Sequence, residues 1–313
     1  MLTLLSDPQA LADLLGTSLR LAVPIAFAAI GGVISERSGV FNVALEGCIL
    51  GGAFGAAVGT YLFGTPVAGL ALAVVVALIA GLILAGLAVG LAINQLVAGI
   101  AINILMLGMT SYLARLILGA DATTTMPGFE PFALPGLSAI PFFGPILFDV
   151  DVLTYALYLL VPFCWWAIYR TPWGLSLRAI GDYPVAADSA GISVPKVRTF
   201  AVLISCALAG MGGAYIVLAQ VHVFTENMSA GKGFIALAAL ILGRWNPVGA
   251  FLACLFFGFS DALQLRLQFS APDVPYQLFS MVPFVASFLA LVVFAGKVRP
   301  PAAIGTRYIR GGK

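Results

Sequence analysis

Long apolar runs, divided by short breaks that contain charged residues, prolines or glycines, make up most of the chain. A helix needs about 20 mostly apolar residues to cross a bilayer, and most of the runs are of that order. They predict nine spans, at residues 17–34, 40–62, 67–92, 94–118, 150–170, 199–220, 230–243, 247–267 and 276–296. The pattern therefore predicts an all-α polytopic membrane protein with about eight to ten transmembrane helices, short or broken ones included.

Three polar stretches interrupt or end this pattern, at 119–149, 171–198 and 297–313. Bases outnumber acids in 171–198 and stand alone in 297–313, whereas 119–149 contains acids and no base. The positive-inside rule places the two basic stretches in the cytoplasm and 119–149 outside. The charged residues in and beside the stretch 171–198 are Arg170, Arg178, Asp182, Asp188, Lys196 and Arg198. Those of 297–313 are Lys297, Arg299, Arg307, Arg310 and Lys313, and those of 119–149 are Asp121, Glu130 and Asp149.

The same argument divides the chain into three parts. Nine crossings with a cytoplasmic C-terminus leave the N-terminus outside, where residues 1–16 carry Asp7 and Asp13 but no base. The parts are an N-terminal extracytoplasmic segment 1–16, a transmembrane domain 17–296 and a cytoplasmic tail 297–313. The N-terminus lacks the basic start of a cleaved signal peptide, so we expect none.

Composition narrows the class further. The chain of 313 residues is 61% hydrophobic and 9% charged, against roughly 45–50% and about 25% in soluble domains. This excludes a soluble enzyme with a single anchor, a disordered chain and a nucleic-acid-binding chain, and the net charge of +2 adds no reason to expect a polyanionic partner. The four cysteines lie in apolar runs without a CxxC pair or a nearby histidine, so we interpret them as core residues rather than a disulfide framework or a metal site: Cys48, Cys164, Cys206 and Cys254.

The run 230–243 is too short for an ordinary span. Its 14 residues reach only ~21 Å, against a hydrocarbon core of ~30 Å. It is either a tilted short span or a half-helix that meets the next helix at Arg244-Trp245-Asn246-Pro247. Broken helices at membrane depth require surrounding protein or a water-filled cavity, and paired breaks indicate a central pathway. Arg244 and Asn246 are therefore candidates for a translocation path or gate.

A second candidate element opens the run 40–62. Asn42 and Glu46 are four residues apart, which on a helix starting near Val40 places them on one face, with Glu46 about 9 Å into the membrane. A carboxylate at that depth costs about 2 kcal/mol unless it faces the bundle interior and finds a partner. Either it makes a structural bond to a neighbouring helix or loop amide, or it belongs to a gate or path. Asn103, deep in the run 94–118, is a further path candidate.

Glycines recur every four residues along the same run, at Gly47, Gly51, Gly55 and Gly59. They lie on one helix face and allow another backbone to approach closely. We interpret this face as ordinary helix packing in preference to a pore lining.

The cytoplasmic stretch 171–198 predicts a short helix at Tyr183–Ala190. Asp182 suits the N-cap, Pro184 suits the first turn and Gly191 is a natural C-terminal stop. Such a helix has little to pack against in its own chain. It is either a surface connector or a docking element for a cytoplasmic partner that moves the membrane helices.

Enzymatic motifs are absent from the sequence. It contains no Walker A loop, no HExxH and no GxSxG, and its only histidine, His222, lies at the outer end of a span. We therefore expect no catalytic residues, no resident cofactor and no metal. Energy for transport would have to come from another chain or an ion gradient.

Four motifs in order along residues 30–296 resemble one transporter family: ERSGVFNVALEG, NQLVAGIAIN, LRAIGDYPVAADSAGISVPKV and GKGFIALAALILGRWNPVGAFLACLFFGFSDALQLRLQ. The third is similar to the cytoplasmic coupling loop of ABC-importer permeases in the branched-chain amino acid, ribose and nucleoside group. Together the motifs are similar to the shorter permease of the nucleoside branch. The resemblance implies a type II ABC importer-like bundle in the plasma (inner) membrane.

The family resemblance also implies partners and roles. A second, related permease chain completes the pathway, an extracytoplasmic solute-binding protein delivers the solute, and a cytoplasmic ABC ATPase carries ATP-Mg. Asn42 and Glu46 match the family's NxxxEG element. The implied ATPase-coupling residues are Arg178, Asp182, Tyr183, Pro184, Ala187, Asp188 and Gly191.

Two alternatives remain open from sequence. The cargo could be a simple sugar or a branched-chain amino acid instead of a nucleoside. A transporter of another class, ion-coupled and acting alone, would need an intramembrane acid or proton relay. The deep acids are Glu46 and Asp261, and we expect Asp261 to pair with Arg266 near a helix end.

Overall fold

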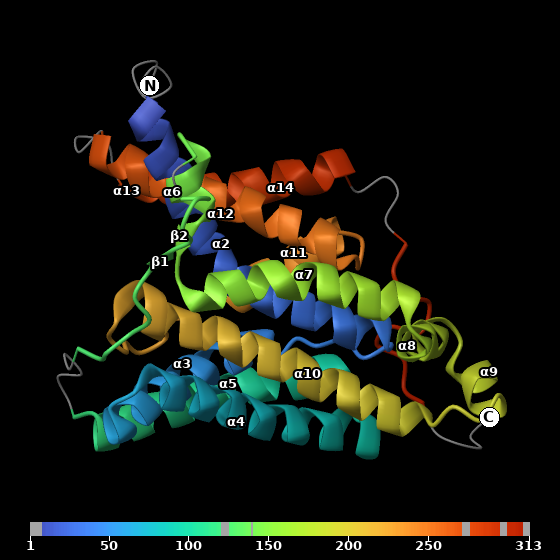
Figure 1. Ribbon diagram of the computed structural model, residues 1–313. Coiled ribbons are helices and arrows are strands. Elements are labelled where there is room, and N and C mark those ends of the chain that lie inside the picture. The colour runs from blue at the N-terminus through green and yellow to red at the C-terminus, as the bar shows by residue number, and fades with distance from the viewer. Residues whose placement is uncertain (1–7, 120–124, 139, 271–275, 295–298, 309–313) are drawn as a thin grey trace.

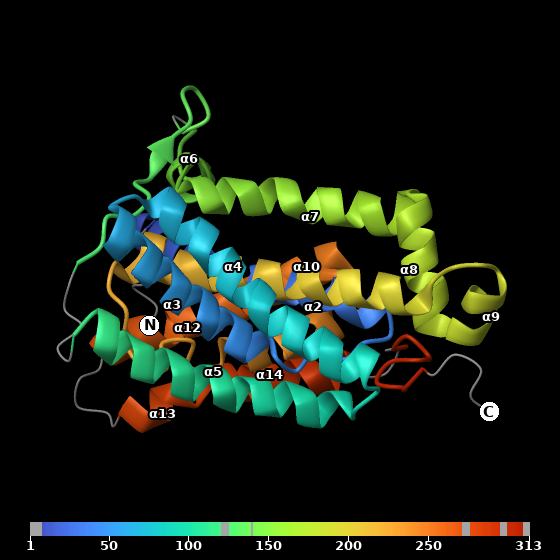
Figure 2. The same ribbon diagram turned by 90° about the horizontal axis from the view of Figure 1, so that it is seen from below.

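A computed structural model describes residues 8–119, 125–138, 140–270, 276–294 and 299–308. The structure is a helical bundle whose long helices run side by side (Figures 1 and 2). Within these described residues, seven helices are long and apolar enough to cross a membrane. Five charged residues used above to orient the chain lie outside the described residues: Asp7, Asp121, Lys297, Arg310 and Lys313.

Seven long elements form the bundle, and two of them end in a π-helical turn. They are α2 (Pro8–Arg37), α3 (Leu45–Phe63), α4 (Pro66–Ala85) with η1 (Gly86–Gly90), α5 (Gln95–Ile117), α7 (Val152–Arg170), α10 (Val194–Tyr215) with η2 (Ile216–Val221), and α12 (Pro247–Ser270). Three shorter helices complete it: α11 (Lys232–Leu242), α13 (Tyr276–Ser280) and α14 (Val282–Phe294). The all-α polytopic fold predicted from the apolar runs is thus confirmed.

The two ends of the bundle differ. At one end, β1 (Phe132–Ala133) pairs antiparallel with β2 (Asp149–Val150) beside α6 (Phe143–Leu147). At the other lie α8 (Pro172–Asp182), α9 (Pro184–Ser189) and residues 299–308 (Figures 1 and 2). The stretches 119–149 and 171–198, which differ in charge, therefore lie at opposite ends.

The core is centred on α2 and α3. Residues 25–30 of α2 are fully buried, and α2 packs against α10, α11 and α12. On α3, a Cβ added at Gly55 or Gly59 would lie 2.8 Å from the backbone of α4. The glycine face of α3 is therefore a packing surface, as predicted, because these backbones approach too closely for a side chain. All four cysteines are buried and free, in agreement with their interpretation as core residues.

Helix boundaries differ from the sequence prediction at several places, among them α10, which begins at Val194 and not at 199. The first helix begins at Pro8 and not near residue 17, and its first turn is bound to α12, where Arg266 Nη1 donates to Ala10 O at 2.6 Å. The last predicted span, 276–296, is divided into α13 and α14. The second span begins at Leu45 and not at 40, because α2 ends in a turn at Gly39, whose φ of 88° is readily adopted by glycine.

Candidate functional site

Glu46, in the first turn of α3, binds the start of α11. Its Oε1 accepts hydrogen bonds from Ser229 Oγ at 2.6 Å and from the Gly231 amide at 2.8 Å, and its Oε2 accepts one from the Gly233 amide at 2.6 Å. The first amides of a helix have no partner within the helix and carry partial positive charge. The carboxylate therefore caps α11 from another helix, which is the structural bond to a loop amide that the sequence left open.

The half-helix interpretation of the run 230–243 is the one observed. The 11 residues of α11 span about 16 Å, and the connection from η2 runs through three non-glycine residues with positive φ, His222, Asn227 and Ala230, before Gly231 at φ 85°. Such conformations persist only where surrounding contacts hold them. Glu46 supplies contacts of this kind at the end of the connection.

The outer part of this connection is joined to α5 by the single ion pair among the described residues. Arg115 Nε donates to Glu226 Oε1 at 2.6 Å and Arg115 Nη2 to Oε2 at 3.2 Å. Hydrogen bonds from the guanidinium lower the pKa of Glu226 below its ordinary value. Both side chains are well exposed, so solvent and salt weaken the pair.

Asn42 and Asn103 hold the turn 38–44 in place. Asn42 is fully buried; its Nδ2 donates to Ser205 Oγ at 2.9 Å and its Oδ1 accepts from the Ala44 amide at 3.1 Å. The prediction that Asn42 and Glu46 share a helix face is wrong, because Asn42 lies in the turn that precedes α3.

Asn103 makes a matching pair of bonds from α5. Its Oδ1 accepts from the Gly47 amide at 2.8 Å, and its Nδ2 donates to Val43 O at 3.0 Å. Gln95, about two turns before Asn103 on α5, accepts a hydrogen bond at its Oε1 from the Phe41 amide at 2.7 Å. Side chains of α5 therefore satisfy backbone groups of the turn and of the first residues of α3 that no helix satisfies.

The break between α11 and α12 lies against the end of α2. Arg244 and Trp245 have φ of 55° and 52°. Arg37 Nε donates to Trp245 O at 2.8 Å, and the Trp245 indole N–H donates to the buried carboxylate of Glu36. Asn246 Oδ1 accepts from the Val248 amide at 3.0 Å and so opens α12 as an N-cap. The sequence indicated a break at Arg244-Trp245-Asn246-Pro247 but did not show that it meets the end of α2.

Tyr169, at the end of α7, lies between two arginines. The Arg37 guanidinium carbon lies 5.8 Å and that of Arg178 lies 5.3 Å from the centre of its ring. Arg37 Nη2 also donates to the Tyr169 hydroxyl at 3.0 Å. Arg178 belongs to α8, so this cation–π cluster joins α8 to the end of α2 and, through Arg37, to the break at Trp245.

The predicted cytoplasmic helix is present as α9, with one correction. Pro184 occupies its first turn, and Gly191, with φ 86°, ends it through a bond from its amide to Asp188 O at 2.9 Å. Asp182 is not its N-cap; that position belongs to Tyr183, which makes no side-chain cap bond. Tyr183 is extended because it precedes a proline, and Asp182 instead ends α8.

Helix α8 was not predicted from the sequence. Thr171 caps it by accepting from the Gly174 amide at 3.2 Å, and Pro172 occupies its first turn. This Thr-Pro pair was the signal that could have predicted it. On α9, Tyr183 and Val185 are 68% and 60% exposed, so the helix presents apolar groups to its surroundings.

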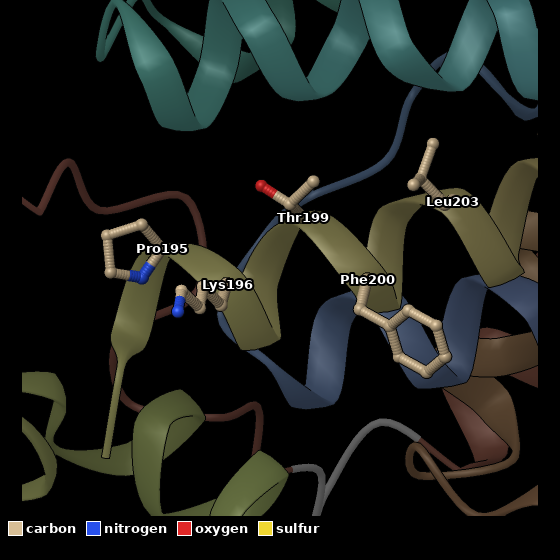
Figure 3. A pocket seen from close by; sticks show the side chains of 5 residues that line it. All are labelled: Pro195, Lys196, Thr199, Phe200 and Leu203. Atoms are coloured by element: carbon tan, nitrogen blue, oxygen red, sulfur yellow. The ribbon is translucent and has the colours of Figure 1, made fainter. Parts of the chain in front are cut away.

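The surface recess found on α10 is mostly apolar. A shallow recess on successive turns of α10 is lined mostly by apolar groups of Pro195, Lys196, Thr199, Phe200 and Leu203 (Figure 3). No group of His, Cys, Asp or Glu able to hold a metal occurs among the described residues.

Asp261 does not pair with Arg266 as expected. Arg266 donates to the Ala10 carbonyl instead. Both Asp261, in α12, and Lys232, in the first turn of α11, are half-buried. The first turn of α11 therefore carries the positive charge of Lys232 in addition to its contacts with Glu46.

Comparison with known proteins identifies the family. Residues 14–296 match the model described as branched-chain amino acid transport system / permease component. The chain is 39% identical to the guanosine ABC transporter permease protein NupQ of Bacillus subtilis, over 97% of this chain and 98% of that protein. It is 33% identical to the nucleoside ABC transporter permease protein NupC of Lactococcus lactis (92% and 94% covered) and 29% identical to the guanosine ABC transporter permease protein NupP of Bacillus subtilis (92% and 85%). The chain therefore belongs to the permease-component family of branched-chain amino acid transport systems.

Proposed function

We propose that this protein is the transmembrane permease subunit of an ATP-binding cassette importer for nucleosides. The observation that carries the proposal is the 39% identity to a guanosine permease along nearly the whole of both chains. The multi-pass helical fold supports it, since seven helices in the described part of the chain have the length and composition to cross a membrane. In this role the chain provides a route for solute and hydrolyses nothing itself.

The assembly contains a second, related permease. Two relatives of this chain, NupQ and NupP, are both named as guanosine permeases of Bacillus subtilis, and this chain is similar to each over most of its own length. A cytoplasmic ABC ATPase binds ATP-Mg, and an extracytoplasmic solute-binding protein delivers the nucleoside. The chain lies in the plasma (inner) membrane with α8, α9 and the C-terminus in the cytoplasm and the N-terminus outside.

The ATPase docks on α9 and the end of α8. The exposed Tyr183 and Val185 supply apolar contact area, while the buried Ala187 anchors α9 to its own chain. Gly191 ends the helix with a positive φ that other residues adopt only under strain. The residues assigned to coupling are Arg178, Asp182, Tyr183, Pro184, Ala187, Asp188 and Gly191.

Movement then passes inward through identified contacts. A shift of α8 displaces Arg178 on the Tyr169 ring, and Tyr169 is bonded to Arg37, which holds the break at Trp245. The break connects α12 to α11, and the first turn of α11 is held by Glu46. Asn42, Glu46, Asn103, Arg244 and Asn246 thus act as the framework of a gate, and α11 is the element that it moves.

The test is uptake by the complete complex in proteoliposomes. With ATP inside and the binding protein outside, we expect uptake of labelled guanosine, competed by other nucleosides and not by glucose or leucine. Competition by glucose or leucine would assign another cargo. Gradient-driven flux through the purified single chain without ATPase would assign the protein to the ion-coupled class instead.

The docking surface has its own test. The double variant Gly191→Pro, Asp188→Arg should recover less ATPase in a pull-down and should lose uptake. Equal recovery and equal uptake in the double variant and the wild type would show that α9 is only a surface connector.

A further inference from the structure

Residues 301–308, in the stretch assigned from sequence to a simple tail, are built into the cytoplasmic end of the bundle. The Ala303 amide donates to Gly181 O at 2.8 Å, and the Gly305 amide donates to Gly39 O at 3.1 Å. The first bond reaches the last turn of α8, and the second reaches the turn between α2 and α3. Ala303 is only 6% exposed, and the segment lies beside α8 (Figures 1 and 2).

Arg198, near the start of α10, depends on this segment. Its side chain is 3% exposed; Nε donates to Ser38 O at 3.1 Å and Nη1 to Thr306 O at 3.1 Å. Its Nη2 has no hydrogen-bond partner, and no carboxylate lies within ion-pair distance in the described parts of the chain. A buried cation without a counter-ion is costly, so the two carbonyls are important to it. One of those carbonyls belongs to the segment.

The segment also reaches α5 and α9. Thr306 O accepts a second bond, from Gln95 Nε2 at 3.5 Å, and Gln95 in turn binds the Phe41 amide. Tyr308 packs on the small apolar cluster that includes Ala187 of α9. One stretch of eight residues therefore contacts α8, α9, the turn at Gly39 and the starts of α5 and α10.

We infer that residues 301–308 form a strap that transmits movement of α8 and α9 to the turn 38–44 and hence to the start of α3. The inference rests on the proposed function, because it assigns a positioning role within ATPase coupling. The Arg178–Tyr169 cluster links α8 to α2 and to the break at Trp245. The strap instead links α8 and α9 to the turn that contains Asn42, and through this turn to the start of α3, where Glu46 lies. Arg198 makes the strap sensitive to displacement, since loss of the Thr306 carbonyl leaves a buried guanidinium with one fewer acceptor.

Two matched proline substitutions test the strap in the full chain. Ala303→Pro removes the N–H that binds Gly181 and places proline at the third position of the 301–304 turn, where it is disfavoured. Ala302→Pro places the same residue at the exposed second position of that turn, where proline is favoured. The pair therefore differs in the strap bond while the chemistry of the substitution is the same.

The first readout needs no partner. Hydrogen exchange of the purified chain in nanodiscs is measured for the amides of residues 183–192. Exchange in Ala303→Pro should be about tenfold faster than in Ala302→Pro, the factor that loss of one buried hydrogen bond produces. Equal hydrogen exchange in the two variants would overturn the inference of a strap, whatever the transport activity of the complete complex.

The second readout is nucleoside imported per ATP hydrolysed by the complete complex. We expect Ala303→Pro to assemble and hydrolyse ATP while this ratio falls about tenfold, and Ala302→Pro to behave as wild type. An unchanged ratio in Ala303→Pro would overturn the inference. A wild-type complex without ATP-driven uptake would overturn the proposed function but leave the exchange result to decide the strap.

A milder variant covers the case in which Ala303→Pro fails to fold. Tyr308→Ala keeps the turn 301–304 and removes the packing of the tyrosine ring against the cluster that includes Ala187. It should speed hydrogen exchange of residues 183–192 and lower the nucleoside imported per ATP, as expected for Ala303→Pro. Wild-type values for both in a folded Tyr308→Ala protein would show that the tail is not coupled to α9.

Discussion

The carboxylate of Glu46 accepts a hydrogen bond of 2.6 Å from the amide of Gly233, so the first turn of α3 is fastened to the first turn of α11. Gly233 has room for no side chain there, because an added Cβ would meet the Glu46 backbone. Two helix starts that lie far apart in sequence thus share one charge. A half-helix whose start is held by a single side chain can be released by changing that side chain.

Replacing Glu46 should therefore release the start of α11 from α3. Glu46→Leu removes the acceptor for Ser229 Oγ and two amides, and we expect it to lower stability by about 2–3 kcal/mol and to abolish uptake while the complex still assembles. Glu46→Gln keeps one oxygen acceptor and should lose less. Thermal unfolding and uptake of both variants check this, and normal uptake by Glu46→Leu would reduce the residue to a local packing role.

The buried bond between Trp245 and Glu36 predicts a double-mutant effect. Trp245→Phe removes the indole N–H and leaves a side-chain oxygen of the fully buried Glu36 without that donor, which should destabilise the protein by about 1–3 kcal/mol. Combined with Glu36→Leu, the same change should cost less, because no buried acceptor is then left without its donor. Unfolding midpoints of the wild type, both single variants and the double variant give the coupling energy; additive effects would contradict the bond.

Tyr169 offers a pair of variants that separates its ring from its hydroxyl. Tyr169→Phe keeps both cation–π contacts and loses only the bond from Arg37, so uptake should fall modestly. Tyr169→Leu loses the ring beneath Arg37 and Arg178 and should reduce the nucleoside imported per ATP severalfold further. ATPase recovery in a pull-down serves as the control, since α9 is untouched. Equal uptake by the two variants would show that the ring does not link α8 to α2.

The Arg115–Glu226 pair predicts a dependence on pH and salt. The folded-state pKa of Glu226 lies below its ordinary value, so its contribution to stability is present above the ordinary carboxyl pKa and is lost as the pH falls through the folded-state value. The difference in unfolding midpoint between wild type and Glu226→Gln should therefore be greatest near neutral pH at low salt. It should shrink in acid and in high salt. A difference that grows on acidification would contradict the pairing.

Much of the fold followed from the sequence because a bilayer imposes length and polarity on every span. The apolar runs predicted the long helices, the shortness of 230–243 indicated a half-helix, and Pro184 with Gly191 predicted α9. What failed were boundaries and pairings that depend on neighbours far along the chain. Asn42 was expected on a helix, yet its bond to Ser205 keeps it in a turn, and Asp261 was expected beside Arg266, which binds Ala10 instead.

The sequence by itself determined that the chain is a polytopic helical membrane protein with opposite charges on its polar stretches and one broken span, because burial in lipid leaves few other solutions for such a composition. Only the tertiary structure decided what the few polar groups do. Glu46 caps α11, Arg37 and Glu36 hold the break at Trp245, and Arg198 holds the turn 38–44 to the tail, because each of these groups meets its partner only after the helices have packed.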